Sequence, residues 1–191
     1  MDFFKFKNDL IPERGRLLIS EPFLPDPNFE RTVVLLCEHN EDGSFGFILN
    51  KPSAVNLDDI IENIEDFQEP VHIGGPVQQD TLHFIHKADY LEGGVDLGNG
   101  LYWGGDYDIL LELIDKKSIK AEDFKFFIGY SGWSEGQLNE ELEANSWIVT
   151  PNATAELVFD HDAEALWKRV LKGLGGRYNV YSNYPTDPRL N

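Results

Sequence analysis

The chain of 191 residues contains very little cysteine, since Cys37 is the only one. One cysteine cannot form a disulfide within the chain, which favours a reducing compartment. Cys37 lies in the apolar run at residues 33–37, so we interpret it as a buried structural thiol and not as a redox group. The sequence also lacks a hydrophobic run long enough for a signal-peptide core or a membrane span. These absences predict a soluble, cytoplasmic protein with no membrane partner.

Positive charge is scarce as well. Sixteen Lys and Arg residues face thirty-four Asp and Glu residues, which gives a formal net charge of −18 at pH 7. Such a surface repels polyanions, so we expect no direct nucleic-acid partner. The one local exception is a short basic cluster formed by Lys168, Arg169 and Lys172, with Arg177 close by. Two long segments, 52–86 and 126–167, contain acidic residues and no Lys or Arg, which is typical of solvated helix faces.

The chain lacks internal repeats, low-complexity tracts and flexible linkers. Its hydrophobic content of 41% supplies enough apolar material for one core at this length. We therefore expect a single domain over residues 1–191, with residues 176–191 as a C-terminal tail. Because the tail carries Tyr178, Tyr181, Tyr184 and Leu190, we expect it to be ordered against the body or a partner.

Apolar patterns predict strands interspersed irregularly with helices. The apolar run near Cys37 is the strongest strand signal, because it is apolar on both faces. Asp106 and Asp162 are each placed to cap a helix. Asn56 is placed to cap a short amphipathic helix with Leu57 and Ile64 on its apolar face, and Ser134 is placed to begin another helix through a capping box. The strands are expected at 15–21, 31–39, 45–50, 71–73, 81–86, 101–103, 123–130 and 147–150. Because strict βαβ alternation is absent, the fold class is α+β with a mixed, largely antiparallel sheet and flanking helices.

Five sequence blocks occur in an order that resembles the YqgE/AlgH family of bacterial proteins. They are DPNFERTVVLLCEHN at 26–40, GSFGFILNKP at 43–52, GGPV at 74–77, LHFIH at 82–86 and GYSGWSEGQL at 129–138. The resemblance implies a barrel-like or bifurcated sheet and a cytosolic location, and it brings no reaction with it. One branch of the family carries a transcriptional-regulator name. The end of the chain, SNYPTDPRLN, departs from the shorter tail expected of relatives, so no function is carried onto residues 176–191.

The GYSGW block places a serine between glycines, as the nucleophile elbow of hydrolases does, but it departs from that motif. An elbow needs a small residue two positions after the serine, but Trp133 stands there after Ser131. The resemblance also implies that relatives often have Ala at this position, which a catalytic serine would forbid. We therefore expect no catalytic residue here.

Metal and phosphate sites are disfavoured by spacing. His83 and His86 are three apart on an expected strand, so they point to opposite faces, and His39 stands in an acidic turn without calcium-loop spacing. The glycine-rich segment 98–106 matches no phosphate-binding motif and ends in Asp106, which would repel an anion at the helix start. The sequence thus predicts no metal and no cofactor.

A candidate site remains by elimination, built from polar and aromatic members of the matched blocks. If the hairpin ends, the GGP turn and the GYSGW turn meet, they would form a small pocket for an anion or a peptide. In particular, Arg31, Trp133 and Gln137 are expected to border one concavity. The alternative is structural: Arg31 pairs with a carboxylate, Asn50 closes the hairpin and Trp133 fills the core. The candidate residues are Arg31, Thr32, Asn50, Gly74, Gly75, Tyr130, Trp133 and Gln137.

The sequence favours a non-enzymatic binding or regulatory protein that acts through a protein partner or a small ligand. Two alternatives stay open: an enzyme of unrecognised mechanism, and a DNA-binding regulator as the family name suggests. Titratable groups with shifted pKa values converging on a pocket would favour the enzyme, whereas a pocket of amides and rings would favour binding alone.

Overall fold

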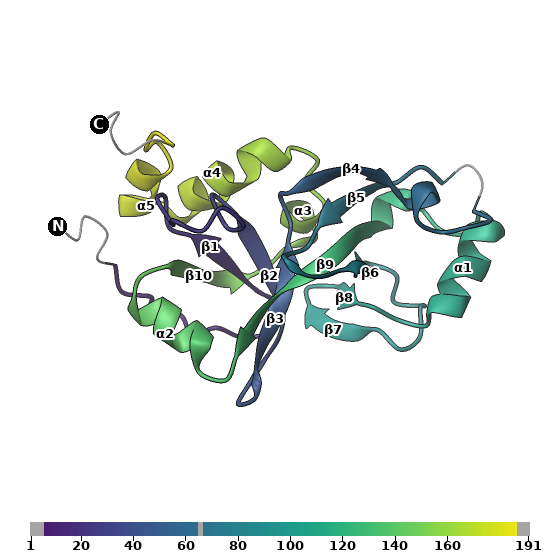
Figure 1. Ribbon diagram of the computed structural model, residues 1–191, viewed down its shortest axis with the longest axis horizontal. Coiled ribbons are helices and arrows are strands. Elements are labelled where there is room, and N and C mark those ends of the chain that lie inside the picture. Colours follow the sequence, from purple (N-terminus) through teal and green to yellow (C-terminus); the bar gives the residue numbers. More distant parts are fainter. Residues whose placement is uncertain (1–5, 65–66, 187–191) are drawn as a thin grey trace.

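The computed structural model describes residues 6–64 and 67–186, which form an open sheet of ten strands with helices on its faces (Figure 1). The strands are β1 (Arg16–Ser20), β2 (Val33–Asn40), β3 (Gly43–Ile48), β4 (Pro52–Asn56), β5 (Pro70–Ile73), β6 (Val77–His86), β7 (Val95–Gly98), β8 (Leu101–Trp103), β9 (Phe124–Ser134) and β10 (Trp147–Asn152). The strongest predicted strand is confirmed as β2, which is buried on both faces because its core is apolar throughout.

The sheet follows the order β10-β1-β2-β3-β9-β6-β8-β7, and β4 and β5 leave this path. The long strand β9 is the branch point. Its residues 131–134 pair with β3, whereas residues 124–130 pair with β6 on one side and residues 126–128 pair with β5 on the other. Within the described residues, β5 and β9 are the one parallel pair. The α+β class and the antiparallel sheet are confirmed, and of the two expected sheet forms the bifurcated one is observed, not closed into a barrel.

The helices lie where capping residues begin them. Asp106 accepts hydrogen bonds from the backbone of Asp108 and Ile109, and Asp162 accepts one from Ala165, so two of the predicted caps are confirmed. The helices are α1 (Tyr107–Asp115), α2 (Gln137–Glu143), α3 (Ala155–Val158), α4 (Ala163–Leu174) and α5 (Gly176–Tyr181), with 3₁₀ turns at Leu57–Asp59 and Ala121–Asp123. None of the helices in residues 6–64 and 67–186 has both the length and the apolar character to cross a membrane.

Side-chain alternation on the strands divides the core between the sheet faces. On β1, Leu17 and Ile19 pack in one cluster with Trp167 of α4, whereas Leu18 packs in another with Trp133 and Trp147. Figure 1 shows α4 and α5 on one side of these strands and α2 on the other. A third cluster lies at the far end, where α1 covers the β5, β6 and β9 region.

Two local predictions were wrong. The helix expected from Leu57 is a single 3₁₀ turn preceded by β4, because Leu57 donates its backbone N–H to Glu69 and Asn63 takes a left-handed φ of 64° that a helix does not tolerate. Ser134 does not cap α2. It remains in β9, paired with Gly43, and Gly136 stands at the helix start.

The C-terminal tail is ordered against the body over its described part, as expected. The ring of Tyr181 is buried and lies 6.0 Å from Tyr178 and 5.7 Å from Tyr184, measured between ring centroids. All three rings pack on the cluster beneath α4. Leu190, the fourth residue of this expectation, lies outside the described residues.

Candidate functional site

The structure separates Arg31 from Trp133 and Gln137. Arg31 precedes β2 with a left-handed φ of 50°, and its guanidinium carbon lies 4.7 Å from the centre of the Trp167 ring. Its Nη2 donates a 2.6 Å hydrogen bond to the backbone oxygen of Tyr184. Burial lowers the pKa of this guanidinium, and nearby Glu30 opposes that effect. Arg31 thus holds the C-terminal segment against α4.

Trp133 lies on the other face of the sheet, beneath α2. Its indole Nε1 donates a 2.9 Å hydrogen bond to Oε2 of Glu141, and the Trp147 indole donates to the same oxygen at 2.7 Å. Gln137 donates to Oε1 of Glu141 at 2.9 Å. The expected concavity shared by Arg31, Trp133 and Gln137 is therefore not formed, because Arg31 packs on Trp167 on one face of the sheet and the other two lie at α2 on the opposite face.

Thr32 and Asn50 join the ends of neighbouring strands. Asn50 Oδ1 accepts from the backbone of Val33 at 2.8 Å, and its Nδ2 donates to the backbone oxygen of Arg31 at 2.9 Å. The Thr32 hydroxyl donates to the backbone oxygen of Phe29. Asn50 therefore closes the hairpin, as the structural alternative predicted.

Gly74 and Gly75 allow two backbone segments to approach closely. A Cβ on Gly75 would lie 2.2 Å from the backbone carbonyl atoms of Tyr130, and one on Gly74 would lie 2.4 Å from the oxygen of Gly129. Beside them, the buried hydroxyl of Ser131 donates to the oxygen of Gly74 at 2.9 Å, which gives this serine a structural role.

Tyr130 and Trp133 are brought together at a shallow groove. This groove lies beside the β2–β3 hairpin, and its other residues are Glu38, Asn40, Asp42, Gly43, Ser44, Phe45, Val77, Gly132 and Ser134. It carries carboxylates and aromatic rings.

A second and more enclosed cavity lies where β5, β9 and the turn between α3 and α4 meet. Its volume is about 220 Å³. We call it the Lys125 pocket, and it is lined by Pro52, Glu69, Pro70, His72, Ala121, Glu122, Phe124, Lys125, Phe159, Asp160, His161 and Ala163. None of the eight candidate residues from the sequence lies in it.

Strand pairing places Lys125 beside His72. On β9, Phe124 and Phe126 point into the cluster under α1, so Lys125 and Phe127 face the other way. The parallel register sets His72 of β5 opposite Phe127, and residues opposite each other share a face. The rings of His72 and Phe127 lie 6.0 Å apart, measured between their centroids. The imidazole of His72 is thus on the strand next to the one that carries Lys125.

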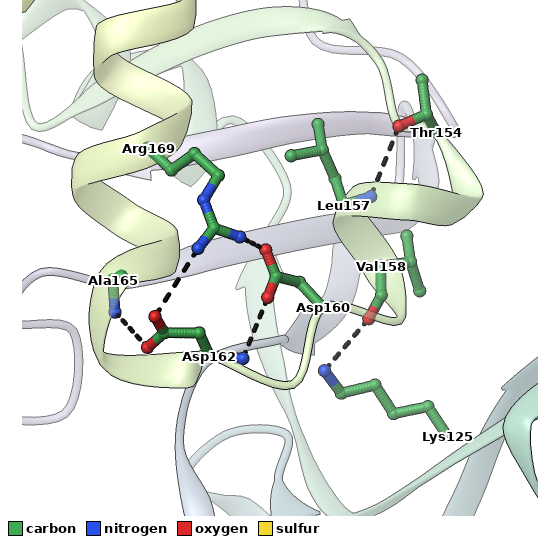
Figure 2. Close-up of polar contacts among 8 residues, drawn as sticks. All are labelled: Lys125, Thr154, Leu157, Val158, Asp160, Asp162, Ala165 and Arg169. Atoms are coloured by element: carbon green, nitrogen blue, oxygen red, sulfur yellow. Dashed lines mark hydrogen bonds and ion pairs between the residues drawn. The ribbon is translucent and has the colours of Figure 1, made fainter.

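The Lys125 ammonium is buried without a carboxylate partner among the described residues. Lys125 is 6% exposed, and its Nζ donates a 3.0 Å hydrogen bond to the backbone oxygen of Val158 (Figure 2). Burial lowers the pKa of this amine to about 8, because the charged form loses its hydration.

His72 is held neutral in the same pocket. Burial lowers its pKa to about 4, and the positive charge of Lys125 acts in the same direction. Its Nδ1 is buried and has no hydrogen-bond partner within the usual geometric limits, although the backbone of Phe126 lies near enough to favour the charged ring slightly. Burial also raises the pKa of Glu69, against an opposing effect of His161.

The turn that supplies the Val158 oxygen is fixed by ion pairs and caps. The guanidinium of Arg169 pairs with Asp160 and lies 3.6 Å from a carboxylate oxygen of Asp162. Asp160 accepts from the backbone N–H of Asp162, which in turn caps α4 through Ala165. Figure 2 shows Asp160 directed toward Arg169, whereas the lysine approaches from the opposite side of the turn. Asp160, two residues after Val158, is thus engaged by arginine and does not neutralise Lys125.

This pocket was not predicted from the sequence, although one signal for it is present. Lys125 interrupts the apolar segment Phe124–Ile128, and a lone charge in such a run is unusual for a buried strand. The described part of the chain contains no group of three His, Cys, Asp or Glu side chains placed to hold an ion.

Comparison with known proteins gives matches along nearly the whole chain. A family model described as AlgH-like matches residues 17–179. A UPF0301 protein of Cytophaga hutchinsonii is 46% identical over 180 residues, which cover 93% of this chain and 98% of the relative.

Two solved structures have the same fold. The solution structure of the AlgH protein of Pseudomonas aeruginosa has a TM-score of 0.71 at 29% identity and covers 94% of this chain and 98% of its own. A crystal structure of a protein from Corynebacterium diphtheriae has a TM-score of 0.76 at 23% identity, with 94% and 95% covered, and at that identity it supports the fold alone.

Proposed function

The chain belongs to the AlgH-like family, and from that premise we propose that it is a non-enzymatic cytoplasmic protein that binds a small ligand in the Lys125 pocket. The names of the relatives specify no activity, so the proposal is built on the pocket's own chemistry.

The buried ammonium of Lys125 is the observation that carries the proposal. An ammonium has three donor hydrogens, and the Val158 oxygen accepts one of them. Removing such a group from water is costly unless hydrogen bonds replace the lost hydration. A ligand oxygen in the cavity would supply that replacement, and His72 on the same wall offers a second polar side chain.

Size and charge narrow the ligand class. At about 220 Å³ the cavity is smaller than the sites of drug-sized ligands, which begin at about 300 Å³. Glu69, Glu122 and Asp160 lie on its wall and disfavour an anion. Pro52, Pro70 and Phe159 provide apolar surface. A small neutral molecule with a carbonyl oxygen and a short alkyl part fits this wall.

Binding of butyramide, a neutral and unreactive carbonyl probe, tests the proposal. Titration of the ¹⁵N-labelled full chain at millimolar concentrations should give saturable shifts of backbone amides in β5, β9 and the turn between α3 and α4. Lys125→Met should abolish them. Lys168→Met, which removes an exposed lysine on α4, should not. Non-saturable shifts, or the same shifts in Lys125→Met, would count against the pocket as a binding site.

An enzyme is the second candidate, and the pKa values favour it. Lys125, His72 and Glu69 have shifted values and line one cavity, which is more typical of a catalytic site than a pocket of amides and rings alone. Against it, the described residues show no hydrogen bond between Lys125 and either pocket histidine, which a nucleophile and its base would be expected to make. Release of a chemically altered product from a small amide or aldehyde, lost in Lys125→Met, would promote this candidate.

A further inference from the structure

Lys125 presents an amine to a cavity from a rigid support. The residue is paired with Ile85 of β6, and the next three residues of β9 are paired with both β6 and β5. Its Nζ is tethered to a neutral carbonyl oxygen, that of Val158, instead of a carboxylate. A carbonyl holds an amine in place without stabilising the ammonium as an anion does.

The burial of this amine has a consequence for its reactivity. With a pKa of about 8, roughly one fifth of the Lys125 side chains are neutral at pH 7.4. An exposed lysine with the reference pKa of about 10.4 is neutral to about 0.1% at that pH. The population of nucleophilic amine is thus about 200-fold larger in the pocket.

We propose that Lys125 captures small neutral aldehydes by forming a reversible imine through Nζ. This inference rests on the proposed function, because it assigns the ligand class and the bonding mode of the same pocket.

The step balances without any further reactant. The lone pair of the neutral Nζ attacks the carbonyl carbon, a C–N bond forms, and the C=O electron pair moves to oxygen, which takes up a proton as nitrogen loses one. The carbinolamine hydroxyl then takes up a proton and leaves as water while the nitrogen lone pair forms the C=N bond, which gives the iminium. Loss of the iminium N–H proton returns the proton that was taken up and gives the neutral imine, so one amine and one aldehyde give one imine and one water.

The wall of the pocket suits both the proton transfers and the ligand. Glu69, whose pKa is raised by burial, and His161 line the cavity and can exchange protons with the carbinolamine oxygen. The apolar side chains accommodate a short alkyl chain, and the carboxylates disfavour an aldehyde that carries its own carboxylate. The class we assign is therefore short aliphatic aldehydes.

Reductive trapping tests the inference. The full chain is incubated with propanal and sodium cyanoborohydride at pH 7.4, and the modified lysines are located by peptide mass spectrometry. We expect propylation of Lys125 to exceed that of exposed Lys168 in the same sample by about tenfold or more. Glyoxylate, the carboxylated comparison, should modify Lys125 less than propanal does.

The pH dependence of trapping is a second readout. The initial rate at Lys125 should rise with pH through about pH 8, where half of the amine is neutral, and level off above about pH 9, where about nine tenths is neutral. The titratable groups that line the cavity with Lys125 are His72 on β5, Glu69 before it, Glu122 in the 3₁₀ turn, and Asp160 and His161 in the turn between α3 and α4, of which Asp160 is paired with Arg169.

The outcomes separate this inference from the proposed function. Saturable butyramide binding without preferential propylation of Lys125 leaves the binding function standing and overturns the imine. Equal modification of Lys125 and Lys168 also overturns it, and stronger modification by glyoxylate overturns the ligand class. Preferential propylation that disappears in Lys125→Met, with the pattern at other lysines unchanged, supports it.

Discussion

Lys125 and Val158 are joined by a hydrogen bond of 3.0 Å from the ammonium to the backbone oxygen, across 33 residues of chain. The contact connects the centre of the sheet to the turn between α3 and α4. It is the best internal partner that the described residues give to a charge that burial penalises.

Replacement of Lys125 by Met should change how stability depends on pH. The folded pKa is about 8 and the unfolded value about 10.4, so between these values the unfolded chain holds one more proton than the folded one. The unfolding free energy of the wild type therefore rises with pH in this window, by up to about 3 kcal/mol relative to Lys125→Met. Below pH 8 the full penalty on the wild type is present.

Urea unfolding at pH 7 and pH 10 measures that difference. Comparison with Lys168→Met corrects for the loss of one positive charge from the molecule. A difference in unfolding free energy between the wild type and Lys125→Met that does not change with pH would contradict the burial of a charged amine.

Glu141 should be the key polar residue beneath α2. Glu141→Ala removes the acceptor of two buried indole N–H groups, those of Trp133 and Trp147, and should lower the unfolding free energy by about 2–4 kcal/mol. Glu141→Gln keeps an acceptor oxygen and should therefore lower the unfolding free energy by less. Tryptophan fluorescence during urea unfolding follows both variants, with exposed Glu140→Ala as the control within about 0.5 kcal/mol of wild type. Equal stabilities of Glu140→Ala and Glu141→Ala would refute the role of the shared carboxylate.

Gly75 should tolerate no side chain. A Cβ there would lie 2.2 Å from backbone atoms of Tyr130, which cannot move without breaking the sheet, so Gly75→Ala should cost about 3 kcal/mol or more. Gly173 in α4 is the matched control, because no atom lies within 4 Å of its added Cβ. Gly173→Ala should stabilise the protein by about 0.5–1 kcal/mol, and thermal unfolding compares the two. Similar melting temperatures for the two variants would disprove the close backbone contact.

Direct binding to duplex DNA is not expected, despite the regulator name in the family. Affinity for DNA depends on Lys and Arg side chains that neutralise phosphates. In the one basic cluster, Arg169 is already paired with Asp160 and Asp162, and the chain as a whole carries a charge of −18. Fluorescence anisotropy with labelled duplex should show no saturable binding at physiological salt. Binding that persists there and is lost on replacing Lys168, Arg169 and Lys172 would favour a DNA-binding regulator.

Local signals were sufficient for much of the fold. The apolar core of β2 predicted a buried strand, and Asp106 and Asp162 predicted the starts of α1 and α4, because these features act within a few residues. The helix expected from Leu57 failed for the opposite reason. A hydrogen bond from the backbone N–H of Leu57 to the backbone oxygen of Glu69 holds Leu57 at the end of β4. Local periodicity contains no information about this long-range hydrogen bond.

The candidate site depended on long-range pairing to a greater degree. The polar residues of the matched blocks were expected to lie together because they stand at strand ends. The face of the sheet on which each side chain lies depends, however, on the register in which the strands pair. Lys125 and His72 lie together because β5 pairs with β9 in parallel, across about fifty residues of sequence. Only the lone charge of Lys125 in an apolar run indicated the pocket beforehand.

The branching of the sheet at β9 determines how a bound ligand would affect the stability of the rest of the molecule. Residues 126–128 are hydrogen-bonded on both sides, so their amides exchange with solvent only when the whole sheet opens. The Lys125 pocket is built on this strand, and its occupant therefore opposes global unfolding instead of the fraying of one edge. Any ligand that binds there should raise the melting temperature of the entire chain in proportion to the logarithm of its concentration, and should slow exchange in β3 as much as in β6.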